Sequence, residues 1–190
     1  MEQGLQLIWV AKFDFRKQLE IAIKTIEKIK HLQNLSLHIC GSGNDRQVFY
    51  YKDLAKSLGI DKNIIWYGNI THDKVLELMQ QMDAFFFTSV SEDTSTVVLE
   101  AISCQLPVIC FNTCGMGYVV NEKVGVKINL MTPEQSINDF AQKIEYLYYH
   151  KDVLHQLAKN CKQRCEELSW DNKTRQMISL YNEALENKNT

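Results

Sequence analysis

Short apolar runs alternate with longer stretches of helical periodicity through the first two thirds of the chain. Each run has the length of a strand, so we interpret these runs as buried strands. The predicted strands are residues 5–11, 35–40, 64–67, 83–87, 107–111 and 125–128. Four of the intervening stretches repeat apolar residues every three or four positions, which indicates amphipathic helices. Because strands and helices alternate, the pattern predicts a parallel, doubly wound sheet with flanking helices, an α/β fold of the Rossmann-like type.

The alternation breaks at two places. Residues 114–117, Cys-Gly-Met-Gly, follow the fifth predicted strand and indicate a glycine-bearing loop. Past the sixth strand only helical periodicity remains, and residues 134–186 predict three helices, the last beginning near Ser169 or Trp170. We expect this last helix to pack away from the main body. The whole chain, residues 1–190, is interpreted as one domain with a helical C-terminal segment.

Composition and charge narrow the class of protein without indicating a ligand. The 190 residues suffice for a hydrophobic core, and the formal net charge of −2 gives no reason to expect nucleic acid as a partner. The six cysteines form no CxxC pair, so we interpret them as buried, reduced thiols. No apolar run approaches the ~20 residues of a membrane-spanning helix, and the N-terminus lacks a targeting signal. We therefore expect a cytoplasmic protein.

The most informative stretch is residues 89–101, which follows the fourth predicted strand and leads into a helix. Glu92 and Glu100 bracket it with seven residues between them, and Ser95 and Thr96 lie inside it. A strand that ends in a polar loop and a helix start is where open α/β sheets bind ligands. The free N–H groups of a first helical turn favour an anion there. A Glu in a loop or helix is more often simply solvated, but Glu100 lies at the edge of an apolar stripe, which favours a position bordering a cleft.

Three motifs, in this order and spacing, resemble a known family. The first motif is Glu92-x7-Glu100, followed by Ala101 and Leu-Pro-Val-Ile at 106–109. The second is Val-Ala-Lys-Phe at 10–13 with Lys17, and the third is a set of strand ends at Gly41-x-Gly43, Gly68 and Asp83. Together they resemble the C-terminal, donor-binding domain of GT-B-fold retaining glycosyltransferases, the group 1 enzymes of glycosyltransferase family 4. The resemblance covers roughly residues 5 to 185.

The resemblance implies a role for each matching position. Lys12 and Lys17 are expected to face the diphosphate of a nucleotide-sugar donor, and Glu92 to approach the hydroxyls of its sugar. Glu100 is expected to accept hydrogen bonds from the ribose hydroxyls. Backbone N–H groups around Ser95, Thr96 and Val97 are expected to contact phosphate or sugar, and the segment from Gly68 to Ile70 to lie near the base. Of these residues, the implied catalytic ones are Glu92, Lys17 and Lys12.

The resemblance also implies partners. The donor is a nucleotide-diphosphate sugar, and the acceptor is a glycan or lipid-linked molecule held by an N-terminal domain that this chain lacks. We therefore expect the 190 residues alone to bind donor but not to transfer sugar. No metal or other cofactor is expected, because lysines and a helix dipole offset the phosphate charge and the five histidines share no metal-ligand spacing. The expected location is the cytoplasm, with at most a peripheral association with the cytoplasmic face of a membrane. The implied process is polysaccharide biosynthesis.

The chain departs from the family pattern at four positions. Ala11 and Gln105 stand where the family usually has glycine, and Lys12 stands where it usually has arginine. Tyr118 occupies the loop position where an acidic residue often follows the glycine pair. These departures leave a non-catalytic binding module of the same fold as one alternative, and a nucleotide-sugar epimerase or phosphorylase-like enzyme as another. A dehydrogenase is disfavoured, because Phe-Asp-Phe-Arg-Lys-Gln follows the first strand instead of a GxGxxG turn.

Overall fold

A computed structural model describes residues 4–92 and 95–186 and contains one six-stranded sheet in that part of the chain. All five pairs of neighbouring strands are parallel, and the order across the sheet is β3-β2-β1-β4-β5-β6. The strands are β1 Leu5–Val10, β2 Leu35–Cys40, β3 Ile64–Gly68, β4 Ala84–Phe87, β5 Val108–Phe111 and β6 Gly125–Ile128. The predicted Rossmann-like α/β fold is confirmed, and each strand lies within a residue or so of its predicted bounds. The order of strands reverses direction between β1 and β4, so the chain leaves β1 for a helix on one face of the sheet and leaves β4 for a helix on the other.

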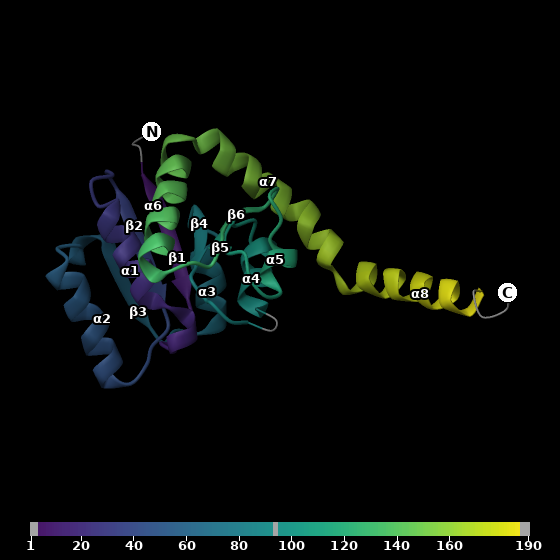
Figure 1. Cartoon of the computed structure of the whole chain (residues 1–190), viewed down its shortest axis with the longest axis horizontal. Coiled ribbons are helices and arrows are strands. Elements are labelled where there is room, and N and C mark those ends of the chain that lie inside the picture. The colour runs from purple at the N-terminus through teal and green to yellow at the C-terminus, as the bar shows by residue number, and fades with distance from the viewer. Residues whose placement is uncertain (1–3, 93–94, 187–190) are drawn as a thin grey trace.

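Helices cover both faces of the sheet (Figure 1). One apolar layer contains residues of α1 (Leu19–Lys28) and α6 (Pro133–Tyr149), and α2 (Asp45–Ser57) packs against its edge. The other layer contains residues of α3 (His72–Met79), α4 (Thr96–Ser103) and α5 (Met116–Val119). Strand β4 serves both layers, because Phe86 belongs to the first while Phe85 and Phe87 belong to the second. This is the pattern of a sheet buried on both faces, and it explains why the strands are continuous apolar runs.

The segment predicted as a loop at 114–117 is partly helical. Gly115 has right-handed helical backbone angles, and α5 begins at Met116 and ends at Val119. The prediction of a loop is wrong there, because two glycines are read as turn signals while the backbone around them forms a single helical turn. Met116 is 2% exposed, so this turn is anchored by a buried apolar side chain.

A close backbone approach shapes the carboxyl edge of the sheet. A Cβ atom on Gly41 would lie 1.8 Å from the carbonyl oxygen of Ala11, and Gly41 has φ of +133°. The amide of Gly41 donates to the carbonyl of Gly68 at 2.8 Å. The ends of β1, β2 and β3 are therefore held together through the main chain, which only glycine permits at position 41.

The C-terminal helices leave the body of the domain. Helix α7 (Lys151–Leu168) packs on α4 and buries Leu154, Leu157 and Cys161. Helix α8 (Trp170–Glu186) then extends away from the sheet, as Figure 1 shows in yellow, and none of its residues is buried. The predicted helical C-terminal segment and the outward last helix are confirmed. The large exposed apolar side chains of α8 are Trp170, Met177, Ile178, Leu180, Tyr181 and Leu185.

The six cysteines carry free thiols. Burial raises the pKa of Cys40 to about 11 and that of Cys110 and Cys161 to about 12, so these thiols stay protonated at neutral pH. Cys104 and Cys165 are partly buried, whereas Cys114 is exposed, so the prediction of burial is wrong at position 114. Within the described residues, no helix is both long enough and apolar enough to cross a membrane.

Candidate functional site

The loops after β1 and β4 are joined by hydrogen bonds at the point where the strand order reverses. The indole N–H of Trp9 donates to the hydroxyl of Thr88 at 3.0 Å, and that hydroxyl donates to the carbonyl of Lys17 at 2.8 Å. The amide of Val90 donates to the carbonyl of Arg16 at 2.9 Å. Thr88 is fully buried, so these bonds form away from water. These hydrogen bonds fix the position of the loop after β1 relative to the loop after β4.

Lys17, in the loop after β1, contacts Glu92, in the loop after β4, although 75 positions separate them in the chain. The ammonium of Lys17 contacts carboxylate oxygen Oε1 of Glu92, and the hydroxyl of Ser89 donates to the same oxygen at 2.6 Å. The side chains of Lys17 and Glu92 are only 20% and 13% exposed. Lys17 also lies 5.5 Å from the centre of the Phe87 ring. Glu92 is therefore a held carboxylate in a half-buried setting, and the alternative of a freely solvated Glu does not apply to it.

Lys12 and Ile70 border a second part of the same edge. A hollow of about 220 Å³ opens between the ends of β1 and β2 and the turn after β3. Its lining residues are Val10, Ala11, Lys12, Cys40, Gly41, Asn69, Ile70 and Val75. Gly68, with φ of +65°, makes the turn that brings Asn69 and Ile70 to this hollow. The structure thus places Lys12 near the segment from Gly68 to Ile70. The sequence had predicted that both would face the same ligand.

The start of α4 lies at this edge, and the first amides of a helix have no acceptor within the helix itself. The amides of Val98 and Leu99 donate to the carbonyl of Ser95, which caps the helix, at 3.1 and 3.4 Å. The amides of Thr96 and Val97 belong to the first turn, which has no intrahelical acceptors for them. The Ser95 side chain makes no capping hydrogen bond. This helix start offers partial positive charge to an anion.

Glu100 lies one turn further along α4 and faces α3. Val98, Ala101 and Ile102 are buried, while the side chain of Glu100 is 29% exposed, as expected for the edge of an apolar stripe. Its Oε1 atom lies 3.2 Å from Nε2 of His72, the first residue of α3. Glu100 does not line the hollow around Lys12 but a separate one toward the C-terminal helices, which Leu168 and Trp170 also line. His72 follows Ile70, which does line the hollow around Lys12, by two residues. His72 was not predicted as a site residue, because nothing in its spacing marks it as a partner of Glu100.

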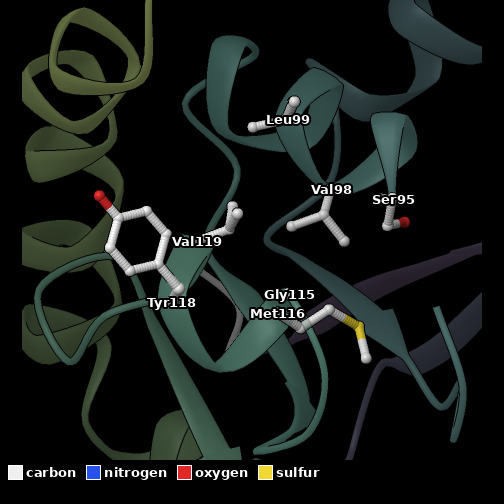
Figure 2. Close-up of a pocket in the computed structure, with 7 residues that line it drawn as sticks. All are labelled: Ser95, Val98, Leu99, Gly115, Met116, Tyr118 and Val119. Carbon is white, nitrogen blue, oxygen red and sulfur yellow. The ribbon is translucent and has the colours of Figure 1, made fainter. Parts of the chain in front are cut away.

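Tyr118 fills the position where the sequence lacks an acidic residue. A cavity of about 180 Å³ lies between α4 and α5 (Figure 2). Its lining residues are Ser95, Val98, Leu99, Gly115, Met116, Tyr118 and Val119. Its walls are mostly apolar, with the Val98 and Leu99 side chains of α4 across from Met116 and Val119 of α5.

The Tyr118 ring is turned to the C-terminal helices. Arg164 of α7 donates from its guanidinium to the carbonyl of Tyr118 at 2.6 Å and to that of Val119 at 3.0 Å. Lys173 of α8 donates to the Tyr118 hydroxyl at 3.0 Å, and this hydrogen bond lowers the pKa of the phenol. These contacts fasten the end of α5 to α7 and α8. They were not predictable, because they join segments whose packing no periodicity specifies.

The predicted absence of a metal stays a prediction. Among residues 4–92 and 95–186 no group of three or more His, Cys, Asp or Glu side chains is arranged to hold an ion. The roles assigned to Lys12, Lys17, Glu92 and Glu100 likewise stay predictions, since the structure shows where these side chains lie and not what they bind.

Comparisons with known proteins agree with the fold. The chain is 25% identical over 181 residues to an uncharacterized glycosyltransferase of Methanocaldococcus jannaschii, which covers 95% of this chain and 45% of that protein. It is 25% identical over 146 residues to the D-inositol 3-phosphate glycosyltransferase of Gordonia bronchialis, covering 77% of this chain and 31% of that one. The chain therefore spans less than half the length of these relatives.

Solved structures share the fold at lower identity. The sucrose-phosphate synthase of Thermosynechococcus elongatus superposes with a TM-score of 0.79 at 21% identity, covering 97% of this chain and 47% of that one. A glycosyltransferase of Rickettsia africae gives a TM-score of 0.79 at 18% identity, covering 98% and 49%. The sequence model of the family described as Glycosyl transferases group 1 matches residues 2–164. The chain therefore belongs to the group 1 glycosyl transferases and has the Rossmann-like fold of their GT-B C-terminal domain.

Proposed function

We propose that this chain is the donor-binding domain of a retaining glycosyltransferase that uses a nucleotide-diphosphate sugar. The observation that supports this most is the contact between Lys17 and Glu92 at the point where the strand order reverses. A cation and a carboxylate at one crevice, beside the start of α4, are the two kinds of group that a sugar diphosphate needs. Family membership favours the same function.

The phosphate end is bound by positive charge. A nucleotide-sugar diphosphate carries roughly two negative charges, which Lys12, Lys17 and the amides at the start of α4 offset. When the diphosphate binds, Lys17 acquires a second anionic partner besides Glu92. The Glu92 carboxylate, still supported by Ser89, then has acceptor capacity for the hydroxyls of the sugar. Binding of the phosphate and binding of the sugar are therefore coupled through one ion pair.

The nucleoside end lies toward α3. Asn69 and Ile70, which follow the turn at Gly68, border the hollow next to Lys12, and this hollow receives the base. Glu100 accepts hydrogen bonds from the ribose hydroxyls, which contribute about 1.5–3 kcal/mol each when the acceptor is charged. A nucleotide would then extend from Ile70, past Glu100, to the start of α4.

The acceptor belongs to another part of the protein. Glycosyl transfer needs an acceptor beside the anomeric carbon and exclusion of water, and proximity of the two reactants supplies much of the rate. In a GT-B enzyme the second wall of the cleft is the N-terminal domain, which would bind a glycan or a lipid-linked acceptor. This chain is accordingly proposed to bind donor without transferring sugar, and no metal takes part.

The departure at Tyr118 favours one competing proposal, a binding module that does not turn over. Residue 118 is a tyrosine, so this position of the loop has no carboxylate. Arg164 donates to the Tyr118 carbonyl and Lys173 to its hydroxyl. The proposed donor site uses other residues, namely Lys17, Glu92 and Glu100, and does not require one. Measured sugar transfer by a full-length protein containing this chain would exclude the binding-module proposal.

A thermal-shift screen tests the proposed function directly. Uridine, guanosine and adenosine diphosphates and their hexose conjugates are each added to the chain at increasing concentration. A ligand at ten times its Kd stabilises the folded state by about 1.4 kcal/mol, which raises the midpoint of a domain of this size by about 3–6 °C. We expect one of the three bases to give this shift with both the diphosphate and its sugar. No shift with any of the six compounds at millimolar concentration would contradict the proposal.

A further inference from the structure

We infer that His72 is a positioning residue that holds the Glu100 carboxylate for recognition of a ribose diol between α3 and α4. The inference rests on the proposed function and adds to it a residue that neither the sequence motifs nor the family comparison assigns. The observation that carries it is the 3.2 Å contact between Nε2 of His72 and Oε1 of Glu100.

The backbone places His72 accurately. His72 is the first residue of α3, and the turn before it contains Gly68 with φ of +65°. The carbonyl of Gly68 accepts a hydrogen bond from Gly41, and the amide of Val75 donates to the carbonyl of Thr71 at 3.1 Å. The turn and the first helical turn are therefore fixed to the sheet edge. The ring itself is 62% exposed, so its contact with Glu100, and not burial, orients it.

Glu100 gains from such a contact because its side chain is long. A free Glu side chain samples many rotamers, and ordering it on ligand binding costs conformational entropy. Its side chain is 29% exposed, so its surroundings leave it partly free. An imidazole that already contacts Oε1 restricts the carboxylate before the ligand arrives. A carboxylate has about four acceptor positions, so one contact from His72 leaves Oε2 and part of Oε1 for two hydroxyl donors.

The ligand chemistry follows from this arrangement. Two adjacent hydroxyls of one ring can both donate to one carboxylate, and the vicinal cis-diol of a nucleotide's ribose supplies such a pair. A 2′-deoxyribose has lost one of the two donors. The preference for ribose over deoxyribose should therefore depend on Glu100 and, through it, on His72.

A bland interpretation is a surface ion pair without function, and the chain contains a matched example. His31 contacts Glu145 at 2.8 Å, with side chains 58% and 38% exposed. His31 precedes β2, so it lies at the opposite edge of the sheet from the candidate site. Exposed pairs of this kind contribute little to stability. Both pairs join a largely exposed His to a Glu, but only the His72 pair lies near the candidate site, which makes His31→Ala the control for His72→Ala.

The test compares the affinities of ribonucleoside and 2′-deoxyribonucleoside diphosphates by calorimetry. The probes are UDP, GDP and ADP with their 2′-deoxy forms. They are titrated into the wild type, His72→Ala, His72→Gln, Glu100→Gln, the double variant His72→Ala/Glu100→Gln and the control His31→Ala. We expect His72→Ala to weaken the ribonucleotide about threefold to fivefold, the scale of a partly exposed pair, and to leave the deoxynucleotide within twofold. His72→Gln, which keeps an N–H donor, should restore most of the loss. In the Glu100→Gln background, His72→Ala should have no further effect.

The possible outcomes distinguish a failure of this inference from a failure of the proposed function. If ribonucleotides bind and depend on Glu100, but His72→Ala leaves the ratio of ribose to deoxyribose affinity unchanged, the role of His72 is wrong and the proposed function stands. If His72→Ala lowers both affinities equally, as a folding defect would, the inference is also wrong. If no nucleoside diphosphate binds the wild type, the proposed function is wrong and the inference with it. A loss in His31→Ala equal to that in His72→Ala would likewise overturn it.

Discussion

At the scale of single residues, Gln105 is the clearest case of a backbone held against its preference. It follows the end of α4 with φ of +57°, and its side chain is exposed. Its amide donates to the carbonyl of Ile102 at 3.0 Å, and the amide of Leu106 donates to that of Ala101 at 2.9 Å. This is the hydrogen-bonded end of a helix at which glycine is favoured, because glycine adopts positive φ without steric cost.

Replacing Gln105 by glycine should therefore stabilise the domain. The left-handed conformation costs an ordinary residue about 1–2 kcal/mol, and the greater freedom of glycine in the unfolded chain offsets part of the gain. We expect Gln105→Gly to raise the free energy of unfolding in urea by about 0.5–1 kcal/mol. Gln163→Gly, in the middle of α7, should lower it by about 1 kcal/mol. A decrease for Gln105→Gly would show that the side chain makes a contact that outweighs the strain.

The sequence indicated where the candidate residues lie in the fold but not which side chains they contact. Glu92 was predicted from the strand, loop and helix around it, and Glu100 from its place at the edge of an apolar stripe. The contacts of Glu92 with Ser89 and Lys17 were not predicted, and neither was the contact of Glu100 with His72. Periodicity defines which face of a helix is buried, but the position of α3 against α4 depends on packing that no local pattern contains. His72 therefore needed the structure.

At the scale of elements, a polar network crosses three strands inside an otherwise apolar sheet. His38 on β2 is 6% exposed and lies 3.0 Å from Oε1 of Gln6 and 3.1 Å from the hydroxyl of Tyr67. Ser36 donates to Oε1 of Gln6 at 2.5 Å. The neutral tautomer satisfies this network, with Nε2–H donating to Gln6 and Nδ1 accepting from Tyr67. Desolvation lowers the pKa of His38, so the folded protein keeps it neutral to a lower pH than the unfolded chain does.

The stability of the domain should consequently fall with acid. Below the ordinary pKa of 6.5, His38 binds a proton in the unfolded chain but stays neutral in the folded protein. The contribution of neutral His38 to the free energy of unfolding is therefore fully present above pH 6.5 and is lost as the pH falls toward the pKa of His38 in the folded protein. The slope is at most about 1.4 kcal/mol per pH unit for one proton. We expect the urea midpoint of the wild type to drop more between pH 7.0 and 5.5 than that of His38→Gln. His155→Gln, on an exposed face of α7, is the control for removing a histidine outside this network. Equal slopes for His38→Gln and the wild type would contradict this account.

The elements themselves were largely predictable, because a sheet covered on both faces leaves continuous apolar runs that periodicity detects. The six strands and the helices between them were predicted close to their observed bounds. The exception is α5, where Gly115 and Gly117 suggested a loop. Its helical turn depends on buried Met116 and on the capping of its last carbonyls by Arg164, which is 45 positions away from Val119. Such long-range contacts override local turn signals.

At the scale of the whole molecule, α8 is an appendage to a domain that is complete without it. It buries none of its residues, and its contacts with the body are close to its start, at Asn172 and Lys173. Its exposed apolar side chains lie close together along one helix, so they form an apolar strip instead of single scattered surface residues. The fold should therefore tolerate its loss.

A chain ending at residue 174 tests this. We expect its thermal midpoint to lie within about 2 °C of the full chain, because removing exposed residues changes the free energy of unfolding by less than about 1 kcal/mol. Sedimentation velocity should show less concentration-dependent association for the shortened chain than for the full one, since the apolar strip is gone. A midpoint lowered by more than about 5 °C would mean that α8 supports the domain.

The account rests on Lys17 and Glu92 forming one site for the diphosphate and the sugar of a donor. The measurement that tests this most directly is calorimetric titration of the wild type and Glu92→Gln with the best nucleoside diphosphate and with its sugar conjugate. Glu77→Gln, which alters an exposed pair with Lys74, is the matched control. We predict that Glu92→Gln weakens binding of the nucleotide sugar by about 1–3 kcal/mol while binding of the bare diphosphate is unchanged or tighter, because Lys17 loses a competing carboxylate. An equal loss for both ligands in Glu92→Gln would contradict the assignment of Glu92 to the sugar.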